Sequence, residues 1–153
     1  MGETNAAQPL IEHYLKLGHP VLVTNTTKTG QARAKSLFLK APYESLFQAV
    51  YLPADQKILV STFFEKYQPK MLILVETELW PNLIAQSQKL QIPTILVNAR
   101  LSEKSAKGYG KVPGLTLAML QGLTQLLAQD DASLARFRAL GMPQKKSQTV
   151  GSI

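Results

Sequence analysis

The sequence predicts an α/β fold in which a Rossmann-like parallel sheet carries helices on both faces. Short β-branched or leucine-rich runs alternate with amphipathic stretches of helical length, which is the pattern of repeated βαβ units. The run at 71–75 has no polar alternation, as expected of a parallel strand covered on both faces. Hydrophobic residues make up 45% of the 153 residues and charged residues 18%, so the chain is too apolar for a disordered segment.

The strands are predicted from short apolar runs bounded by turn residues. Their predicted ranges are 21–24, 49–52, 71–75, 94–98, 125–128 and 147–150. Most gaps between them can hold a crossover helix, which a parallel connection requires.

The early helices are predicted from apolar positions about four residues apart and from stop signals. After an opening loop, the first helix has Leu10, Ile11, Tyr14 and Leu15 on one face and ends at Gly18. The second follows residue 30 and turns residues 34, 37 and 38 inward, and the third covers 58–64 and ends before the proline at 69.

Proline and capping side chains predict where the later helices begin. The starting residues are Pro81, Ser102 and either Asp130 or Asp131. The helix after residue 81 is expected to turn Leu83, Ile84 and Leu90 inward. The last predicted helix runs through residues 134 and 137 to 140–141.

No internal repeat, low-complexity tract or linker interrupts the chain, so residues 1–153 are predicted to form one domain. A doubly wound sheet normally begins with a strand that feeds its first loop, whereas this chain opens in a loop and a helix. We therefore expect the first strand to be missing. An exposed sheet edge would then favour dimerisation or poor solubility.

The composition excludes several classes of site. The chain has no cysteine and two histidines, which excludes a disulfide framework and makes a zinc cluster unexpected. No apolar run approaches the roughly 20 residues of a membrane-spanning helix, and the first residues lack the features of a secretory signal. A formal net charge of +7 favours phosphate-bearing partners, which include nucleic acid, anionic lipid and phosphorylated sugars.

The first polar cluster follows the strand at 21–24. Neither a phosphate-loop motif nor the Gly-x-Gly-x-x-Gly motif follows any strand, which argues against the familiar nucleotide-binding domains. Instead Thr26, Thr27, Thr29 and Gly30 form a hydroxyl-rich loop at a helix start. Such a loop can direct N–H groups and hydroxyls at an anion. The alternative is a polar turn with a helix cap.

The second cluster follows the strand at 71–75 and contains Glu76, Glu78, Trp80 and Pro81. In open α/β sheets ligands bind beyond the carboxyl ends of the strands, so Glu76 stands where chemistry usually takes place. For Glu78 the alternative is a cap of the helix that follows.

The third cluster follows the strand at 94–98 and concentrates positive charge in Arg100, Lys104 and Lys107. Its alternative is a solvated charged helix. Because the carboxyl ends of parallel strands share one edge of a sheet, the polar clusters together predict a common cleft.

Five motifs follow one another along the chain: Gly2-Glu3, the loop ending Thr29-Gly30, Tyr51-Leu52-Pro53, Glu-Thr-Glu-Leu-Trp-Pro-Asn at 76–82, and Asn-Ala-Arg-Leu-Ser-Glu-Lys-Ser-Ala-Lys-Gly-Tyr at 98–109. Together they resemble the 3-deoxy-D-manno-octulosonic acid (Kdo) transferase family. Their order and spacing match from Gly2 to about Gly151.

The resemblance implies the N-terminal domain of an inverting GT-B glycosyltransferase, built from two Rossmann-like domains around a cleft. The first domain would receive the lipid A precursor and the second would hold CMP-Kdo, with no metal or other cofactor. Glu3 maps onto the family's general base, and Glu76 onto a second active-site carboxylate. At a helix start Glu3 would be kept ionised by the helix dipole. The cations of the third cluster and the threonine loop would suit the acceptor's phosphates.

Two departures from the family shape the expectations for this chain. The family usually begins with a hydrophobic membrane anchor and continues into a donor domain, whereas these residues start at Met1 and end in Gly151-Ser152-Ile153. We therefore expect the C-terminal donor-binding domain to be absent and the chain alone to transfer no sugar. The full-length family acts at the cytoplasmic face of the inner membrane, and this chain without its anchor is expected to be cytoplasmic.

One alternative is a non-catalytic module that binds phosphorylated glycolipid or an anionic membrane surface. Nucleic-acid binding is not expected, because the aromatic residues lie in core runs rather than on a basic stacking face.

Overall fold

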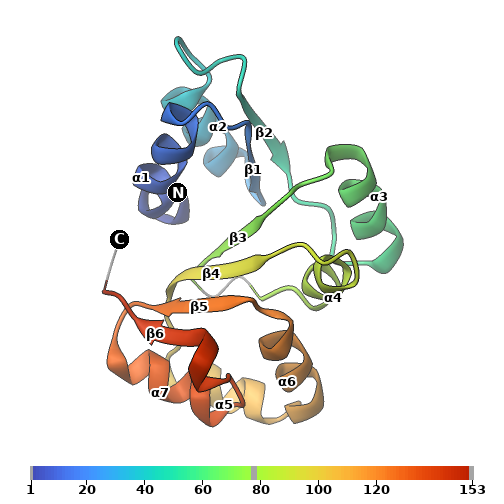
Figure 1. The fold of residues 1–153 in the computed structure, drawn as a ribbon, viewed down its shortest axis with the longest axis vertical. Coiled ribbons are helices and arrows are strands. Elements are labelled where there is room, and N and C mark those ends of the chain that lie inside the picture. The colour runs from blue at the N-terminus through green and yellow to red at the C-terminus, as the bar shows by residue number, and fades with distance from the viewer. Residues whose placement is uncertain (1, 77–78, 152–153) are drawn as a thin grey trace. The chain divides into compact units, whose positions relative to one another are not determined.

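The computed structural model describes the backbone of residues 2–76 and 79–151 and the side chains of residues 7–76 and 79–151. The chain forms two compact units, Met1–Leu52 (unit 1) and Pro53–Ser152 (unit 2). Each unit is an arrangement of parallel strands and helices, which confirms the predicted α/β class (Figure 1).

Unit 1 is built on a pair of parallel strands. Its elements are α1 (Gly2–Lys16), β1 (Val21–Asn25), α2 (Lys28–Phe38) and β2 (Phe47–Tyr51). The strands pair in register from Val21 opposite Phe47 to Asn25 opposite Tyr51. Both helices pack on this sheet, and Leu15, Ala34, Phe38 and Phe47 are buried between them.

Helix α1 begins at Gly2 rather than after the predicted opening loop. Its buried residues Ala7, Ile11 and Leu15 recur every four positions, so one apolar stripe faces the sheet. The sequence pattern predicted this stripe only from residue 10 onwards, whereas the helix also includes Pro9 and the residues before it. The predicted stop at Gly18 is confirmed, since Gly18 has a φ of +85°.

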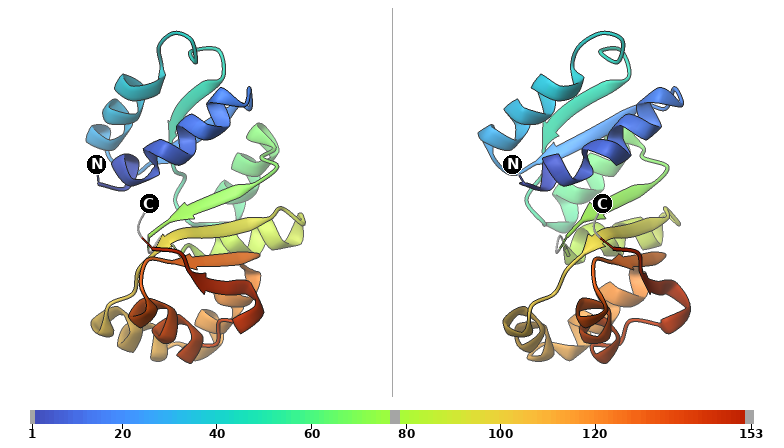
Figure 2. Two further views of the ribbon diagram at one scale, coloured as in Figure 1. Left: turned by 60° about the vertical axis from the view of Figure 1, so that its left-hand side comes forward. Right: turned by 90° about the vertical axis from the view of Figure 1, so that its left-hand side faces the viewer.

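Unit 2 contains a sheet of four parallel strands in the order β3-β4-β5-β6, coloured from light green to red in Figure 2. Its elements are α3 (Lys57–Tyr67), β3 (Leu72–Val75), α4 (Pro81–Lys89), β4 (Thr94–Ala99), α5 (Glu103–Gly110), α6 (Pro113–Gly122), β5 (Gln125–Ala128), α7 (Asp131–Ala139), the 3₁₀ turn Gln144–Lys146 and β6 (Ser147–Thr149). All of the predicted strands are present in the two units, with ends that differ by at most two residues.

The core of unit 2 lies between this sheet and its crossover helices. Leu74, Leu96 and Leu126 of neighbouring strands are buried, as are Ile84 of α4 and Phe137 of α7. Complete burial of each such side chain contributes roughly 1.5–3 kcal/mol to folding. The core fixes the strands, and thereby the edge at which their carboxyl ends lie.

Helix α6 was not predicted. It begins with Pro113 at its first turn, but its apolar residues surround the axis: Leu115 and Leu117 are exposed while Met119 and Leu120 are buried. A helix without a single apolar stripe gives no periodic signal. The inward orientation expected for Leu90 is wrong, because this residue lies after the last turn of α4 and is 49% exposed.

Among the residues that the structure describes, no helix is both long enough and apolar enough to cross a membrane.

Candidate functional site

The carboxyl edge of the unit 2 sheet gathers polar side chains from three neighbouring strands. Glu76 follows β3, Asn98 and Arg100 lie at the end of β4, and Gln129 and Asp130 follow β5. Because these strands are parallel and adjacent, their ends reach the same edge.

Two of these residues adopt the left-handed backbone conformation. Glu76 has a φ of +63° and Asn98 a φ of +51°. Asparagine tolerates this region, but for glutamate it costs on the order of 1–3 kcal/mol. A backbone hydrogen bond from the N–H of Glu76 to the carbonyl oxygen of Val97, at 3.0 Å, holds the strained turn against β4. Strain of this kind is concentrated at functional sites.

The carboxylate of Glu76 lies beside the guanidinium of Arg100. Nη2 of Arg100 is 3.9 Å from Oε2 of Glu76, and the side chains are 63% and 25% exposed, respectively. An exposed pair at this distance contributes only about 0–1 kcal/mol to stability. This contact involves only Nη2 of Arg100, so other N–H groups of the guanidinium can donate to a further anion.

The ends of β4 and β5 are joined by Asn98 and Gln129. Nε2 of Gln129 donates to Oδ1 of Asn98 at 3.2 Å, and the N–H of Gln129 donates to the carbonyl oxygen of Ala99 at 2.8 Å. Asn98 is 3% exposed, so this contact lies beneath the surface at the carboxyl edge of the sheet. Sequence reasoning had no signal for the role of Gln129, since the contact joins residues 31 positions apart.

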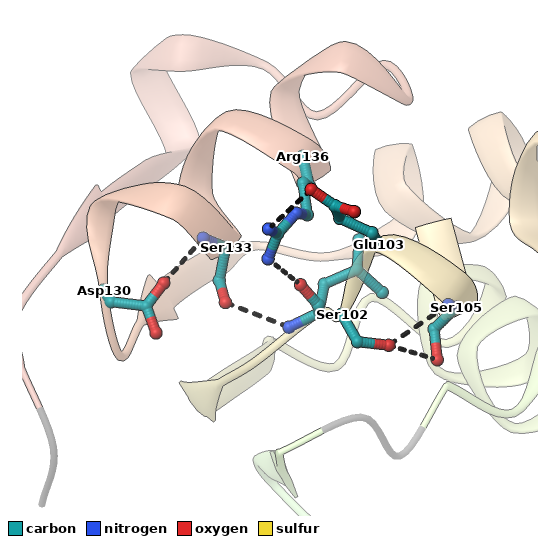
Figure 3. A network of polar contacts seen from close by, with 7 residues as sticks. Ser102, Glu103, Ser105, Asp130, Ser133 and Arg136 are labelled. Atoms are coloured by element: carbon teal, nitrogen blue, oxygen red, sulfur yellow. Dashed lines mark hydrogen bonds and ion pairs between the residues drawn. The ribbon is translucent and has the colours of Figure 1, made fainter. Parts of the chain in front are cut away.

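A second network holds the segment that carries Arg100 (Figure 3). The N–H of Leu101 donates to Oγ of Ser133 at 3.0 Å, and Nη1 of Arg136 donates to the carbonyl oxygen of Leu101 at 2.7 Å. Arg136 also lies 3.8 Å from Oε1 of Glu103. Helix α7 thus binds both the N–H and the carbonyl oxygen of Leu101, the residue directly after Arg100.

Asp130 begins this network as the N-cap of α7. Its Oδ1 accepts a hydrogen bond from the N–H of Ser133 at 2.7 Å, which confirms the predicted cap. This backbone bond and the hydrogen bond with the Ser133 side chain hold the pKa of Asp130 below its usual value, although desolvation opposes them. The charges of Arg136 and Arg100 lower the pKa further, to a smaller extent. The carboxylate therefore stays ionised at neutral pH.

Lys104 and Lys107 lie on α5, of which no residue is buried. The predicted cap is confirmed: Oγ of Ser102 accepts from the N–H of Ser105 at 3.1 Å. Both lysines are exposed, as in the alternative of a solvated charged helix.

In unit 1 the threonine loop forms the start of α2. Oγ1 of Thr27 accepts from the N–H of Gly30 at 3.0 Å, so the helix cap that was the alternative for this loop is present. Gly30 is buried, and a Cβ there would approach Oγ1 of Thr27 to 3.1 Å and Nδ2 of Asn25 to 3.2 Å. Thr26 and Thr29 are exposed.

The two remaining predicted residues are described only in part. Glu3 belongs to the first turn of α1, and its side chain lies outside the described residues, as does the whole of Glu78. The convergence of Glu3 and Glu76 on one sugar stays a prediction.

Comparison with known proteins places these motifs among sugar transferases. A family model described as 3-deoxy-D-manno-octulosonic-acid transferase (kdotransferase) matches residues 1–153. A 3-deoxy-D-manno-octulosonic acid transferase of Haemophilus influenzae is 38% identical over 156 residues, which cover 100% of this chain and 35% of that protein. The transferase of the same name from Bordetella pertussis is 38% identical over 141 residues, covering 92% of this chain and 33% of that protein.

A bifunctional glycosyltransferase/methyltransferase of Fusobacterium nucleatum is also similar, at 30% identity over 154 residues, or 100% of this chain and 24% of that protein. The chain therefore spans about a third or less of the length of these relatives.

Proposed function

This chain belongs to the 3-deoxy-D-manno-octulosonic-acid transferase family, and from this premise we propose that it supplies the acceptor-binding part of a glycosyltransferase. The whole enzyme would have the GT-B architecture and transfer Kdo from CMP-Kdo to a lipid A precursor, with inversion at the anomeric carbon. It would act at the cytoplasmic face of the inner membrane in lipopolysaccharide synthesis. Residues 1–153 would together serve as its N-terminal acceptor domain.

The observation that supports this proposal most is the pairing of Glu76 with Arg100 at the carboxyl edge of the unit 2 sheet. A strained, partly exposed carboxylate stands 3.9 Å from a guanidinium that is 63% exposed. Guanidinium groups suit the phosphates and carboxylates of an anionic acceptor, because they donate two parallel hydrogen bonds. Lys104 and Lys107 would add positive charge along α5.

The proposed chemistry needs a base for an acceptor hydroxyl. The hydroxyl oxygen would attack the anomeric carbon of Kdo while the bond from that carbon to the phosphate of CMP breaks, and CMP would leave with the electron pair. The proton of the hydroxyl would pass to the carboxylate of Glu3, a role worth typically a factor of about 10² to 10⁴ in rate. Glu76 would be the second carboxylate of the site. The threonine loop at 26–30 would contribute to acceptor binding.

Binding of the acceptor by the 153-residue chain tests this proposal. The only tryptophan, Trp80, precedes α4 four residues after Glu76, so its fluorescence can report occupation of the site. The chain would be titrated with a bisphosphorylated lipid A precursor in neutral detergent micelles. We expect saturable binding that Arg100→Ala weakens about tenfold or more. A titration without saturation would contradict the proposal.

The net charge of +7 favours one other candidate, a module that binds any anionic membrane surface. Micelles containing phosphatidylglycerol distinguish the two. A general surface binder would bind them as tightly as it binds the lipid A precursor, and its affinity would not depend on Arg100 more than on any other exposed cation. The proposed acceptor site should prefer the bisphosphorylated glycolipid.

A further inference from the structure

Asp55 binds the start of a helix that lies far from it in the chain. Its Oδ2 accepts a hydrogen bond from the N–H of Asn82 at 3.0 Å, and its Oδ1 accepts one from the N–H of Leu83, also at 3.0 Å. The side-chain amide of Asn82 returns a hydrogen bond to the carbonyl oxygen of Asp55 at 2.8 Å. A single aspartate thus makes three contacts with the first turn of α4.

These contacts complete a helix start that has no cap of its own. The residue at the N-cap of α4 is Trp80, whose side chain makes no capping hydrogen bond, and Pro81 at the first position has no N–H. The N–H of Ile84 donates to the carbonyl oxygen of Trp80 at 3.0 Å. The donors of Asn82 and Leu83 remain, and both oxygens of Asp55 accept from them.

Helix α4, whose start Asp55 binds, begins at Pro81, five residues after Glu76 in the chain. The N–H of Glu76 itself donates to the carbonyl oxygen of Val97. Asp55 itself stands directly before Gln56, the N-cap of α3, and α3 packs against α4. Asp55 therefore directly precedes the N-cap of one helix, while its carboxylate binds the start of the other.

We infer that Asp55 is a positioning residue for the candidate site. By fixing the start of α4, which begins five residues after Glu76 in the chain, it restricts the place of Glu76 beside Arg100. The inference rests on the proposed function only in taking Glu76 as part of the site.

The first experiment needs no ligand. Amide hydrogen exchange and side-chain resonances of the ¹⁵N,¹³C-labelled 153-residue chain would be compared for wild type, Asp55→Ala and Asp55→Asn. The asparagine keeps one acceptor oxygen and serves as the milder variant should the alanine variant unfold. We expect exchange at Asn82 and Leu83 to be at least tenfold faster than in wild type, with displaced signals of the Glu76 carboxyl and the Arg100 guanidinium.

Arg138→Ala is the matched control. It also removes two side-chain hydrogen bonds, from Nε of Arg138 to Oγ of Ser147 at 3.1 Å and from Nη2 to the carbonyl oxygen of Ser147 at 2.8 Å. Ser147 begins β6, at the opposite edge of the sheet from the candidate site. The inference is overturned if Arg138→Ala displaces the Glu76 and Arg100 signals as far as the Asp55 variants do, or if the Asp55 variants leave them unchanged.

The second experiment measures coupling to Glu76 through binding of the lipid A precursor. Dissociation constants would be compared for Asp55→Asn, Glu76→Gln and the double variant. If Asp55 acts through the Glu76 segment, the double variant should bind about as weakly as Glu76→Gln alone, whereas Arg138→Ala should combine additively with Glu76→Gln. Additive effects of Asp55 and Glu76 would refute the inference.

If the wild-type chain binds no lipid A precursor, that result contradicts the proposed function and not the inference about Asp55. The exchange experiment would then decide by itself whether Asp55 positions Glu76.

Discussion

At the scale of single residues, Glu76 combines backbone strain with a weak ion pair. Its φ of +63° is one that glycine adopts without cost, yet the chain places a carboxylate there beside Arg100. A pair worth about 0–1 kcal/mol does not offset a conformation that costs on the order of 1–3 kcal/mol. The ion pair therefore does not account for a carboxylate at this position, whereas the role in the site proposed above would account for it.

We predict that Glu76→Gly is more stable than Glu76→Ala by about 1 kcal/mol, because both variants lose the carboxylate and only glycine relieves the strain. Urea unfolding followed by circular dichroism measures the difference. The same comparison at Gln68, which has a φ of +46° at the end of α3, is the control. Gln68→Gly should be more stable than Gln68→Ala by a similar amount, and neither Gln68 variant should change acceptor binding. Both Glu76 variants should bind the acceptor more weakly. Equal stabilities of Glu76→Gly and Glu76→Ala would show that the turn is not strained.

At the scale of elements, a helix cap supplied by the preceding residue can be predicted from sequence, whereas a cap supplied by a distant residue cannot. Ser102, Thr27 and Asp130 cap helices that begin at the next residue, so they could be predicted from sequence. The cap of α4 comes from Asp55, which lies 27 residues before Asn82. A contact of this kind depends on the fold and leaves no local pattern.

The cap of α7 gives a prediction for pH dependence. Asp130 has a lowered pKa in the folded chain, so between the folded and unfolded pKa values the unfolded state binds more protons and stability rises with pH. The contribution is present at neutral pH and is lost as the pH falls through the lowered pKa. Asp130→Asn keeps a capping oxygen and removes the charge. Melting temperatures of wild type and this variant should differ most at pH 7 and converge near pH 2, and a difference that grows on acidification would contradict the assignment.

At the scale of the whole molecule, most of the fold and part of the site could be predicted from sequence. The apolar runs predicted the strands because a buried parallel strand is apolar on both faces. They also placed Glu76 and Arg100 at one edge. Tertiary structure determines the remaining features of the site. They are the left-handed turn at Glu76, the contact between Asn98 and Gln129, and the hydrogen bond from Arg136 to Leu101. Helix α6 escaped prediction because its apolar residues form no stripe.

At this scale the reaction proposed for the whole enzyme also requires a site that binds the donor, CMP-Kdo. The chain spans about a third of the length of the Haemophilus influenzae and Bordetella pertussis relatives, and it carries neither of the glycine-rich motifs that commonly bind nucleotide phosphates. We therefore expect the 153-residue polypeptide to release no CMP from CMP-Kdo in the presence of the lipid A precursor. A coupled assay for CMP measures this, with a known amount of added CMP as the positive control. Turnover by the purified chain would show that the donor site lies within these residues.

The strand order of unit 2 bears on how the protein is made. The strands β3, β4, β5 and β6 lie in the sheet in the order in which they occur in the chain. As synthesis proceeds from the N-terminus, each new strand leaves the ribosome when its neighbour is already available. No later strand has to insert between two that have paired, so this sheet can assemble by successive addition at one side while translation is still under way.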